Sequence, residues 1–421
     1  MKLLFNVLLM LPFSLYAQPK GIHFEEGVSW KAIKAKARAE HKLIFMDCFA
    51  TWCGPCKMMA QRIFPLDEVG RVMNEKFVCV GVQMDSTVKD NQEVRNWYAD
   101  ARRIEKEYKV GEYPTFLFFN AEGQPLHKTI GAMGSSEEFL AKVNDALDEN
   151  KQYFTLMGHY RQHLNDSAYL RNAIIAALTA RDEVNAASIG DAYADCIKNL
   201  FAKDNLRLIL GSMISSRNRG FDILLHHGTE VDTSLGINTA EKTLVWMIRK
   251  EEINPLTKKD NTEVDWKGLY ARLKEKYPQQ AQKAVLGACA DYYAIRKRWK
   301  EYGPAIVEYV DKVDDHHDMD RLNDFAWNIF LKCDDFTVLA SALNWSRFTF
   351  SNDSIPDDNR IDTYANLLYK SGDVKGAICW EQKAMSLVAA KSNNKQRYNF
   401  HKYAQTIERM QRGEKVWENP L

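Results

Sequence analysis

Two cysteines, Cys53 and Cys56, stand on either side of Gly54-Pro55 in the segment WCGPCK. A pair of thiols at this spacing could bind a metal ion, close a structural disulfide or exchange electrons with other thiols. A zinc site needs four ligands, and no second Cys or His pair follows at short spacing. A loop of two residues constrains almost no unfolded-chain entropy, which argues against a stabilising staple. We therefore interpret the pair as a redox dithiol that forms and breaks its own disulfide.

The neighbouring segments would place this pair at the junction of a strand and a helix. Residues 42–50 are nearly continuously apolar, which predicts a strand buried on both faces. A helix is expected over 55–74, where Pro55 is tolerated because first-turn amides have no intrahelical partner. The positive end of that helix would stabilise a thiolate at Cys53 and lower its pKa, and Lys57 adds a nearby cation.

The first 150 residues continue this alternation of strand-like and helix-like segments. Apolar runs predict further strands, and helical stretches with capping residues separate them. Strands are expected at 21–24, 77–84, 115–119 and 126–131, and helices at 28–40, 88–109 and 135–149. Two strand–helix–strand crossovers would make part of the sheet parallel, so the fold class is α/β.

Residues 22–149 resemble a thioredoxin domain, because WCGPCK is the active-site sequence of that family. The resemblance implies an α/β thioredoxin fold in which Cys53 attacks a substrate disulfide and Cys56 resolves the mixed disulfide. Asp47, six residues before Cys53, falls where the family keeps a buried carboxylate that handles the proton of the second cysteine. The residue patterns of segments 29–47 and 62–80 are similar to those of the thioredoxin-like domain of periplasmic thiol–disulfide interchange proteins.

The same resemblance implies a substrate groove. Tyr113-Pro114-Thr115 resembles the cis-proline turn that faces the cysteines, and Gly131 resembles the loop glycine that borders the groove. Backbone beside Pro114 would pair with the substrate chain. The implied substrate-binding residues are Trp52, Gly54, Pro55, Tyr113, Pro114, Thr115 and Gly131.

Two features depart from the family pattern. Gly81 is expected on the central strand, where many thioredoxins have a lysine near the buried carboxylate. Residues 86–109 form a longer segment than the thioredoxin pattern, which predicts an extended helix at the domain edge. The first departure bears on how the pKa of Asp47 is set.

The N-terminal residues resemble a targeting segment. Met1-Lys2 is followed by a largely apolar stretch at 3–15 and by Ala17 before a polar segment. Residues 1–17 are therefore predicted to be a cleavable secretory signal, with a retained membrane anchor as the alternative. Export, to the periplasm by the resemblance, is the expected localisation.

Beyond residue 150 the strand signals stop and helical spacing takes over. In residues 362–387, the small residues Ala365, Gly372, Ala377 and Ala384 resemble a tetratricopeptide helical hairpin, and residues 321–348 look like a divergent copy. The expected organisation is a thioredoxin-like domain at 18–150, an all-α domain at 151–320 and helical-hairpin repeats at 321–421, either separate from or continuous with the preceding helices. Breaks between helices are expected at Gly228, Pro255, Pro278 and Gly303-Pro304.

Other residues that could do chemistry receive structural interpretations. Cys48 and Cys79 are expected on neighbouring strands as small core residues. Cys196, Cys289, Cys333 and Cys379 lie far apart in apolar surroundings and are interpreted as buried free thiols. Adjacent histidines at 226–227 and within 314–320 point apart on a helix, so they are interpreted as solvated helix-start loops and no metal site is expected.

The overall charge limits the partners. Lys+Arg 57 against Asp+Glu 56 gives no basic field for nucleic acid. The expected function is an exported protein thiol–disulfide oxidoreductase with a helical domain that binds a partner, and Gly-Pro between the cysteines favours a reductase. The expected partners are disulfide-bearing exported proteins and a membrane or soluble electron donor, with no cofactor beyond the Cys53–Cys56 disulfide. The alternatives are a non-catalytic helical-repeat scaffold and a disulfide oxidase or isomerase.

Overall fold

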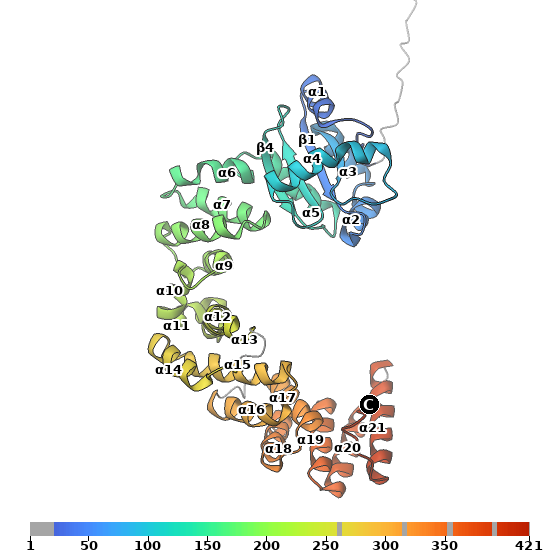
Figure 1. Cartoon of the computed structure of the whole chain (residues 1–421), viewed down its shortest axis with the longest axis vertical. Helices are drawn as coiled ribbons and strands as arrows, with labels where there is room; N and C mark the ends of the chain where they lie inside the picture. Colours follow the sequence, from blue (N-terminus) through green and yellow to red (C-terminus); the bar gives the residue numbers. More distant parts are fainter. Residues whose placement is uncertain (1–20, 259–262, 314–317, 352–356, 390–393, 421) are drawn as a thin grey trace, which may run out of the picture. The chain divides into compact units, whose positions relative to one another are not determined.

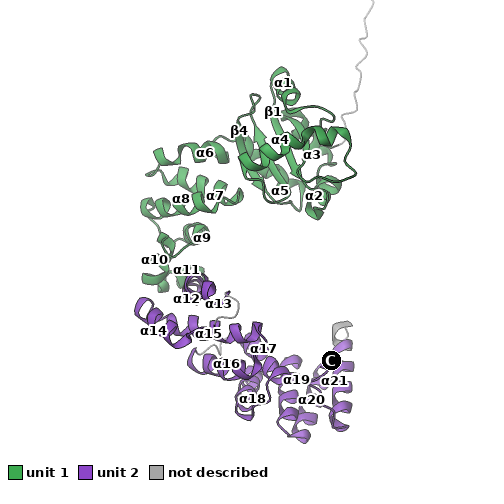
Figure 2. Ribbon diagram, in the orientation of Figure 1, with its two compact units in different colours: residues 1–237 green, residues 238–421 purple. Residues whose placement is uncertain are grey.

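The computed structural model describes residues 21–258, 263–313, 318–351, 357–389 and 394–420. It divides into two compact units, residues 1–237 and residues 238–421, which are coloured separately in Figure 2. The predicted targeting segment at 1–17 and most of the histidine-containing segment at 314–320 lie outside the described residues. The predicted boundaries at 150 and 320 remain predictions.

The first unit contains one four-stranded sheet (Figure 1). Its strands are β1 (Leu43–Phe49), β2 (Phe77–Gln83), β3 (Thr115–Phe119) and β4 (Pro125–Ile130), in the order β2-β1-β3-β4. The pair β1–β2 is parallel, and β3 is antiparallel to both β1 and β4. The strand expected at 21–24 is reduced to a single parallel bridge from Phe24 to Cys79 on β2. The predicted α/β thioredoxin fold is confirmed.

Helices cover both faces of this sheet. They are α1 (Trp30–Glu40), α2 (Gly54–Met58), the π-helix η1 (Met59–Ile63), α3 (Asp67–Lys76), α4 (Gln92–Tyr108) and α5 (Ser136–Leu147). One buried cluster joins α1 and α4 to one face of the sheet, with Trp30 and Ile104 among its members. A second cluster joins η1, α3 and α5 to the other face, with Met59, Val69 and Phe139 among its members. The sheet is therefore buried on both sides, as its continuous apolar strands predict.

The single helix predicted over 55–74 is wrong in one respect, because the segment is interrupted. The backbone runs from α2 directly into η1 and stops before Pro65, and α3 starts at Asp67. Proline has no amide hydrogen to donate and disfavours helical backbone in the residue before it. The interruption separates the short segment that begins at the cysteines from the α3 helix that packs against the sheet.

After residue 150, every element in the described part of the chain is a helix. The first unit adds α6 (Tyr153–His159), the 3-10 turn η2 (Tyr160–Gln162), α7 (Ser167–Thr179), α8 (Glu183–Cys196), α9 (Lys203–Ser212), α10 (Arg219–His226) and α11 (Gly228–Leu235). The second unit contains α12 (Thr239–Ile248), η3 (Arg249–Ile253), α13 (Asn254–Thr257), α14 (Trp266–Lys276), α15 (Ala281–Ile295), α16 (Trp299–Val313), α17 (Met319–Lys332), α18 (Phe336–Ser351), α19 (Asp358–Lys370), α20 (Val374–Ala389) and α21 (Asn394–Gln411). The predicted all-α second part is confirmed.

The helices α19 and α20 form the hairpin whose small residues stood out in the sequence. Gly372 lies between them with φ +97°, a conformation that favours glycine. Ala365, Ala377 and Ala384 are fully buried where the helices pack. A second pair of neighbouring helices, α17 and α18, is in contact over the segment interpreted as a divergent copy. The tetratricopeptide assignment of these hairpins remains a prediction.

The expected break at Gly303-Pro304 is wrong, because α16 runs through both residues. The close approach of a neighbouring helix explains why residue 303 is a glycine. A Cβ atom on this residue would lie 3.1 Å from the Val338 side chain of α18. Glycine therefore permits a close helix–helix contact in the middle of α16 instead of ending the helix.

The six remaining cysteines are free thiols. Cys48 and Cys79 are buried on the adjacent strands β1 and β2, as expected. Burial raises the pKa of both thiols, which keeps them protonated and unreactive. Among the four cysteines after residue 150, the expectation of burial holds for Cys333, whereas Cys196 and Cys289 are half-buried and Cys379 is exposed. Cys379 lies on α20 outside the apolar seam that Ala377 and Ala384 define.

No described helix has both the length and the apolar composition needed to cross a bilayer.

The adjacent histidines at 226–227 bind different partners, as their opposed directions predict. His226 contacts Asp222 at 3.0 Å, and His227 contacts Glu230 at 3.2 Å. Within the described ranges, no group of three His, Cys, Asp or Glu side chains is arranged to hold a metal ion.

Candidate active site

The two cysteines of WCGPCK form a disulfide at the N-terminus of α2, with their Cα atoms 5.4 Å apart. Cys53 is the N-cap residue of this helix, and the amide of Cys56 donates a hydrogen bond to Cys53 Sγ at 3.1 Å. A thiolate at Cys53 would receive the same hydrogen bond and face the positive end of the helix. Cys53 is 2% exposed and Cys56 is 6% exposed, so the disulfide lies just beneath the surface.

Asp47 lies on β1 at the floor of a cavity next to the disulfide. It is 7% exposed, and within the described residues its Oδ1 atom has no hydrogen-bond partner. Burial in this apolar position raises the pKa of Asp47 from 3.8 to about 7. The cavity has a volume of about 290 Å³, and Cys56 and Lys57 line it together with Asp47. A carboxyl group with a pKa near neutral thus lines the same cavity as Cys56.

Gly81 explains why there is a cavity at this place. It is the direct neighbour of Asp47 across the parallel β1–β2 pair, and it also lines the cavity. The expectation that Gly81 lies on the central strand is wrong, because β2 is the first strand in the sheet order and β1 and β3 are central. The neighbour relation to Asp47 nevertheless holds. A side chain at residue 81 would occupy space that is open here, and no cation from residue 81 reaches the carboxyl group.

Several residues of the implied groove contact one another beside the disulfide. The Tyr113–Pro114 peptide bond is cis, and Gly131, with φ +98°, donates its amide to the Pro114 carbonyl at 2.9 Å. Tyr113 packs against the buried cluster that contains Cys53 and Cys56. Trp52 is 70% exposed, and its ring meets the Tyr113 ring edge-on at 5.8 Å.

The remaining implied groove residues differ in what they expose. Gly54 and Pro55 are exposed beside the disulfide. Thr115 is fully buried, and its hydroxyl donates to the Glu112 carbonyl at 2.7 Å. The Thr115 side chain therefore fixes the loop before Pro114, and substrate contact at this residue falls to the backbone. The rings of Trp52 and Tyr113 are in contact, and Gly131 is hydrogen-bonded to Pro114. The substrate-binding roles of these residues remain predictions.

One residue at this site, Asp85, was not predicted from the sequence. The Asp85 carboxylate accepts hydrogen bonds from the Thr51 amide, at 3.0 Å, and from the Thr51 hydroxyl. Thr51 directly precedes Trp52 and Cys53, so Asp85 fixes the approach to the dithiol. Asp85 follows β2, and the longer segment after it is organised by Asp90, which accepts hydrogen bonds from Thr87 and Tyr98. No local pattern reveals a contact between residues 34 positions apart.

Comparisons with known proteins find thioredoxin-like sequences. Residues 30–147 match the family model described as "Thioredoxin-like domain". Thioredoxin-T of Drosophila melanogaster is 33% identical over 105 residues, and Thioredoxin Y1, chloroplastic, of Arabidopsis thaliana is 26% identical over 106 residues. Each alignment covers 25% of this chain, and it spans 54% and 51% of these relatives, about half of their length.

One solved structure is similar to part of this chain. It is the solution structure of a candidate disulphide-isomerase from Bacteroides thetaiotaomicron, with 33% sequence identity and a TM-score of 0.26. The match covers 31% of this chain and 98% of that one. The family model covers the sheet, its helices and the WCGPCK segment, and its match ends before α6. Residues 30–147 of this chain form a thioredoxin-like domain.

Proposed function

We propose that this chain is a protein thiol–disulfide oxidoreductase that reduces disulfides in exported proteins. The observation that carries the proposal is the Cys53–Cys56 pair at a helix N-terminus, with a buried carboxyl group of near-neutral pKa opening onto the same cavity as Cys56. These are the parts that thiol–disulfide exchange requires: a stabilised attacking thiolate, a second thiol and a group that moves its proton.

The reduced protein would act in two exchange steps. The Cys53 thiolate attacks one sulfur of the substrate disulfide, forming a mixed disulfide and releasing the other substrate sulfur as a thiolate. Cys56 then loses its proton to Asp47 and attacks Cys53 Sγ, which releases the second substrate sulfur. The substrate gains two electrons and the protein is left with the Cys53–Cys56 disulfide. A dithiol donor, membrane-bound or soluble, returns the two electrons, and no cofactor takes part.

The proposed substrate groove lies beside the cis Tyr113–Pro114 bond. Backbone at this loop would pair with an extended substrate segment, with Trp52, Gly54, Pro55, Tyr113 and Gly131 around it. The exposed ring of Trp52 and the packed ring of Tyr113 support this choice, because they offer apolar surface directly beside the disulfide. Thr115 supports the loop from beneath through its hydrogen bond to Glu112.

We also propose a direction of electron transfer and a cellular location. The Gly-Pro dipeptide between the cysteines resembles reducing members of the family, and Lys57 is the one cation immediately next to the pair in sequence. The signal-like composition of residues 1–17 supports export to the periplasm. The helices after residue 150, including the tetratricopeptide-like hairpins, are proposed to bind a partner protein.

Reduction of insulin by dithiothreitol, with and without the protein, tests this function. Wild type is expected to accelerate insulin precipitation, and Cys53→Ser is expected to abolish the effect. Cys379→Ser removes an exposed thiol far from the site in sequence and is the matched control, which should behave like wild type. Equal activity in wild type and Cys53→Ser would show that the dithiol does not take part in the reaction. The non-catalytic helical-repeat scaffold would then be the better interpretation.

The reduction potential of the Cys53–Cys56 pair tests direction separately. A reductase is expected near thioredoxin, at about −270 mV, whereas a disulfide donor would lie near the oxidising end at about −120 mV. Equilibration with glutathione or dithiothreitol buffers, followed by alkylation and mass spectrometry, gives the value. A potential at the oxidising end would retain the exchange chemistry and reverse its proposed direction.

A further inference from the structure

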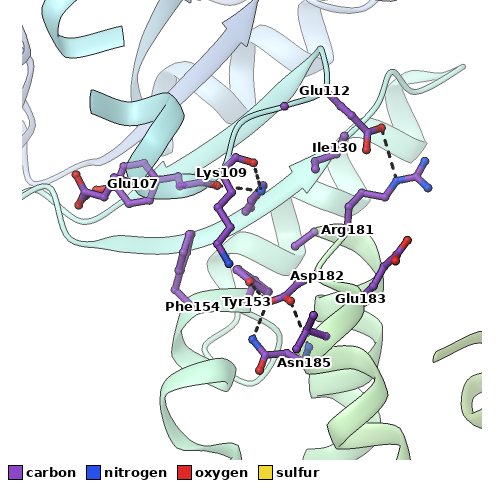
Figure 3. Close-up of a pocket in the computed structure, with 15 residues that line it drawn as sticks. Glu107, Lys109, Glu112, Ile130, Tyr153, Phe154, Arg181, Asp182, Glu183 and Asn185 are labelled. Carbon is purple, nitrogen blue, oxygen red and sulfur yellow. Dashed lines mark hydrogen bonds and ion pairs between the residues drawn. The ribbon is translucent and has the colours of Figure 1, made fainter. Parts of the chain in front are cut away.

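A second cavity lies where the first helices after the thioredoxin-like domain meet that domain (Figure 3). Its volume is about 610 Å³, far larger than the roughly 30 Å³ that one water molecule takes up in the liquid. One wall is the loop after α4 together with the end of β4, and the other is the turn between α7 and α8. Both walls belong to the first compact unit.

This cavity begins directly beside the proposed substrate groove. Gly111 and Glu112 line it, and they immediately precede Tyr113, which packs on the disulfide. Ile130 also lines it and immediately precedes Gly131, which is hydrogen-bonded to Pro114. An extended chain advances about 3.3–3.6 Å per residue, so residues a few positions from a substrate cysteine would reach the cavity.

The floor of the cavity is held in place by satisfied polar groups. Asp182, the N-cap of α8, accepts hydrogen bonds from the Tyr153 hydroxyl and the Asn185 amide group, both at 2.6 Å. The buried Lys128 ammonium donates to the carbonyls of Tyr108 and Lys109 at 3.0 and 3.1 Å, closing the end of α4. These groups fix the walls and leave little capacity for a ligand.

The capacity that remains is mainly that of hydrogen-bond donors. In the described part of the chain, the Lys109 ammonium makes no hydrogen bond or ion pair, and it attracts the engaged Asp182 carboxylate only at longer range. Arg181 uses only Nε, which lies 3.9 Å from the Glu112 carboxylate, and its two terminal nitrogens have no partner among the described residues. Figure 3 shows Lys109 reaching from the end of α4 toward Tyr153 and Asp182, while Arg181 extends toward Glu112.

Three of the four carboxylates around the cavity are already engaged. Asp182 is bound as described, Glu112 faces Arg181, and Glu107 accepts from the Tyr108 hydroxyl and from Arg103. Glu183 is exposed on the first turn of α8. The partners named above already occupy three of these carboxylates. The remaining donor groups of Lys109 and Arg181 can therefore form charge-assisted hydrogen bonds with an incoming carboxylate.

We propose that this cavity is a substrate subsite that takes an acidic side chain located two to four residues from the reacting cysteine. The inference rests on the proposed function, because the occupant is part of the disulfide-bearing polypeptide. Lys109 and Arg181 are its specificity-determining residues. The turn between α7 and α8 thus completes a groove that the thioredoxin-like domain begins, and it gives the first helices a role in choosing substrates.

The test compares disulfide peptides that are identical except for Glu, Gln or Lys at one position two to four residues from the cysteine. Full-length wild type is expected to reduce the Glu peptide with a kcat/KM about fivefold above that of the Gln peptide, and the Lys peptide least well. The ratio is taken within each protein preparation, so it does not depend on the active fraction. The preference is expected to shrink as salt is added.

Two double variants with the same loss of charge locate the effect. Lys109→Gln with Arg181→Gln should bring the Glu-to-Gln ratio to about one, with the single variant Arg181→Gln in between. Arg102→Gln with Lys106→Gln removes two exposed cations of α4 outside the cavity and should keep the wild-type ratio. Thermal unfolding of each variant verifies that the fold is retained.

Two results separate the subsite from the function on which it rests. Equal reduction of all three peptides by wild type, or an unchanged preference in the Lys109/Arg181 double variant, overturns the subsite and leaves the oxidoreductase function standing. Failure of wild type to reduce any peptide overturns the proposed function, and the subsite falls with it.

Discussion

Replacing Asp47 by asparagine should make the thioredoxin-like domain more stable at alkaline pH than at acidic pH, relative to wild type. Burial places the pKa of this carboxyl group at about 7 in the folded protein, against 3.8 in the unfolded chain. Because the folded-state pKa is the higher one, folding favours the protonated form. The stability that Asp47 contributes is therefore fully present below pH 3.8 and is lost as the pH rises through 7.

The magnitude follows from the size of the shift. A difference of about three pKa units corresponds to about 4 kcal/mol in the free energy of unfolding. Integration over pH places roughly 2.5 kcal/mol of this loss between pH 5 and pH 8. Asparagine carries no charge at either pH, so the stability difference between Asp47→Asn and wild type should grow by that amount. The free-energy cost of fitting the asparagine side chain into this site is the same at both pH values. It therefore cancels when the stability differences at the two pH values are compared.

Native-state hydrogen exchange at pH 5 and pH 8 measures this difference. The readout is the protection of amides in β1 and β3, whose exchange requires opening of the sheet. Both proteins are kept oxidised, so that neither Cys53 nor Cys56 titrates. A stability difference that is the same at both pH values within about 0.5 kcal/mol would refute the reasoning. It would mean that the cavity solvates Asp47 well enough to keep its pKa ordinary.

Three further outcomes are expected. Asp85→Ala removes both hydrogen bonds to Thr51 and should lower kcat for insulin reduction about tenfold. Asp100→Ala, which removes a partly exposed carboxylate of α4, is the control and should not lower kcat. Glu381 is fully buried next to Asp362, and its pKa is raised mainly by burial and further by the Asp362 carboxylate. The free energy of unfolding of Glu381→Gln should therefore exceed that of wild type by an amount that grows as the pH rises above about 4.5. Hydrogen exchange of α20 amides measures this difference. A fragment of residues 18–152 should unfold at lower urea than one of residues 18–200, because it lacks Phe154, which packs on Tyr108 at 5.8 Å.

Much of the thioredoxin-like domain could be predicted because its signals are local. The apolar run at 42–50 and the run at 115–119 became the two central strands, since only a strand buried on both faces tolerates such composition. The WCGPCK segment located the helix start, because proline at the second helical position and the cysteine cap are read directly from neighbouring residues. The break at Pro65 was missed although proline signals it, because the apolar pattern continues across the break.

The rest of the site depends on contacts between distant residues. Asp85 binds Thr51 across two strands, and the Tyr153 hydroxyl binds Asp182 across two helices. In sequence each of these polar residues looks like part of a solvated surface. The same is true of Glu381, which helical spacing does not distinguish from an exposed residue although it lies buried beside Asp362. Register and packing decide such positions, and neither is encoded in a short window.

The central claim is that Cys53 is the sulfur that attacks substrate disulfides. Full-length Cys56→Ser protein should be reduced, mixed with a disulfide peptide, quenched by alkylation and mapped by mass spectrometry. We expect the peptide to be bound to Cys53, because Cys53 has the helix N-terminus beside it and its resolving partner has been removed. A peptide bound instead to Cys379, the exposed free thiol of α20, or no covalent adduct at all, would contradict it.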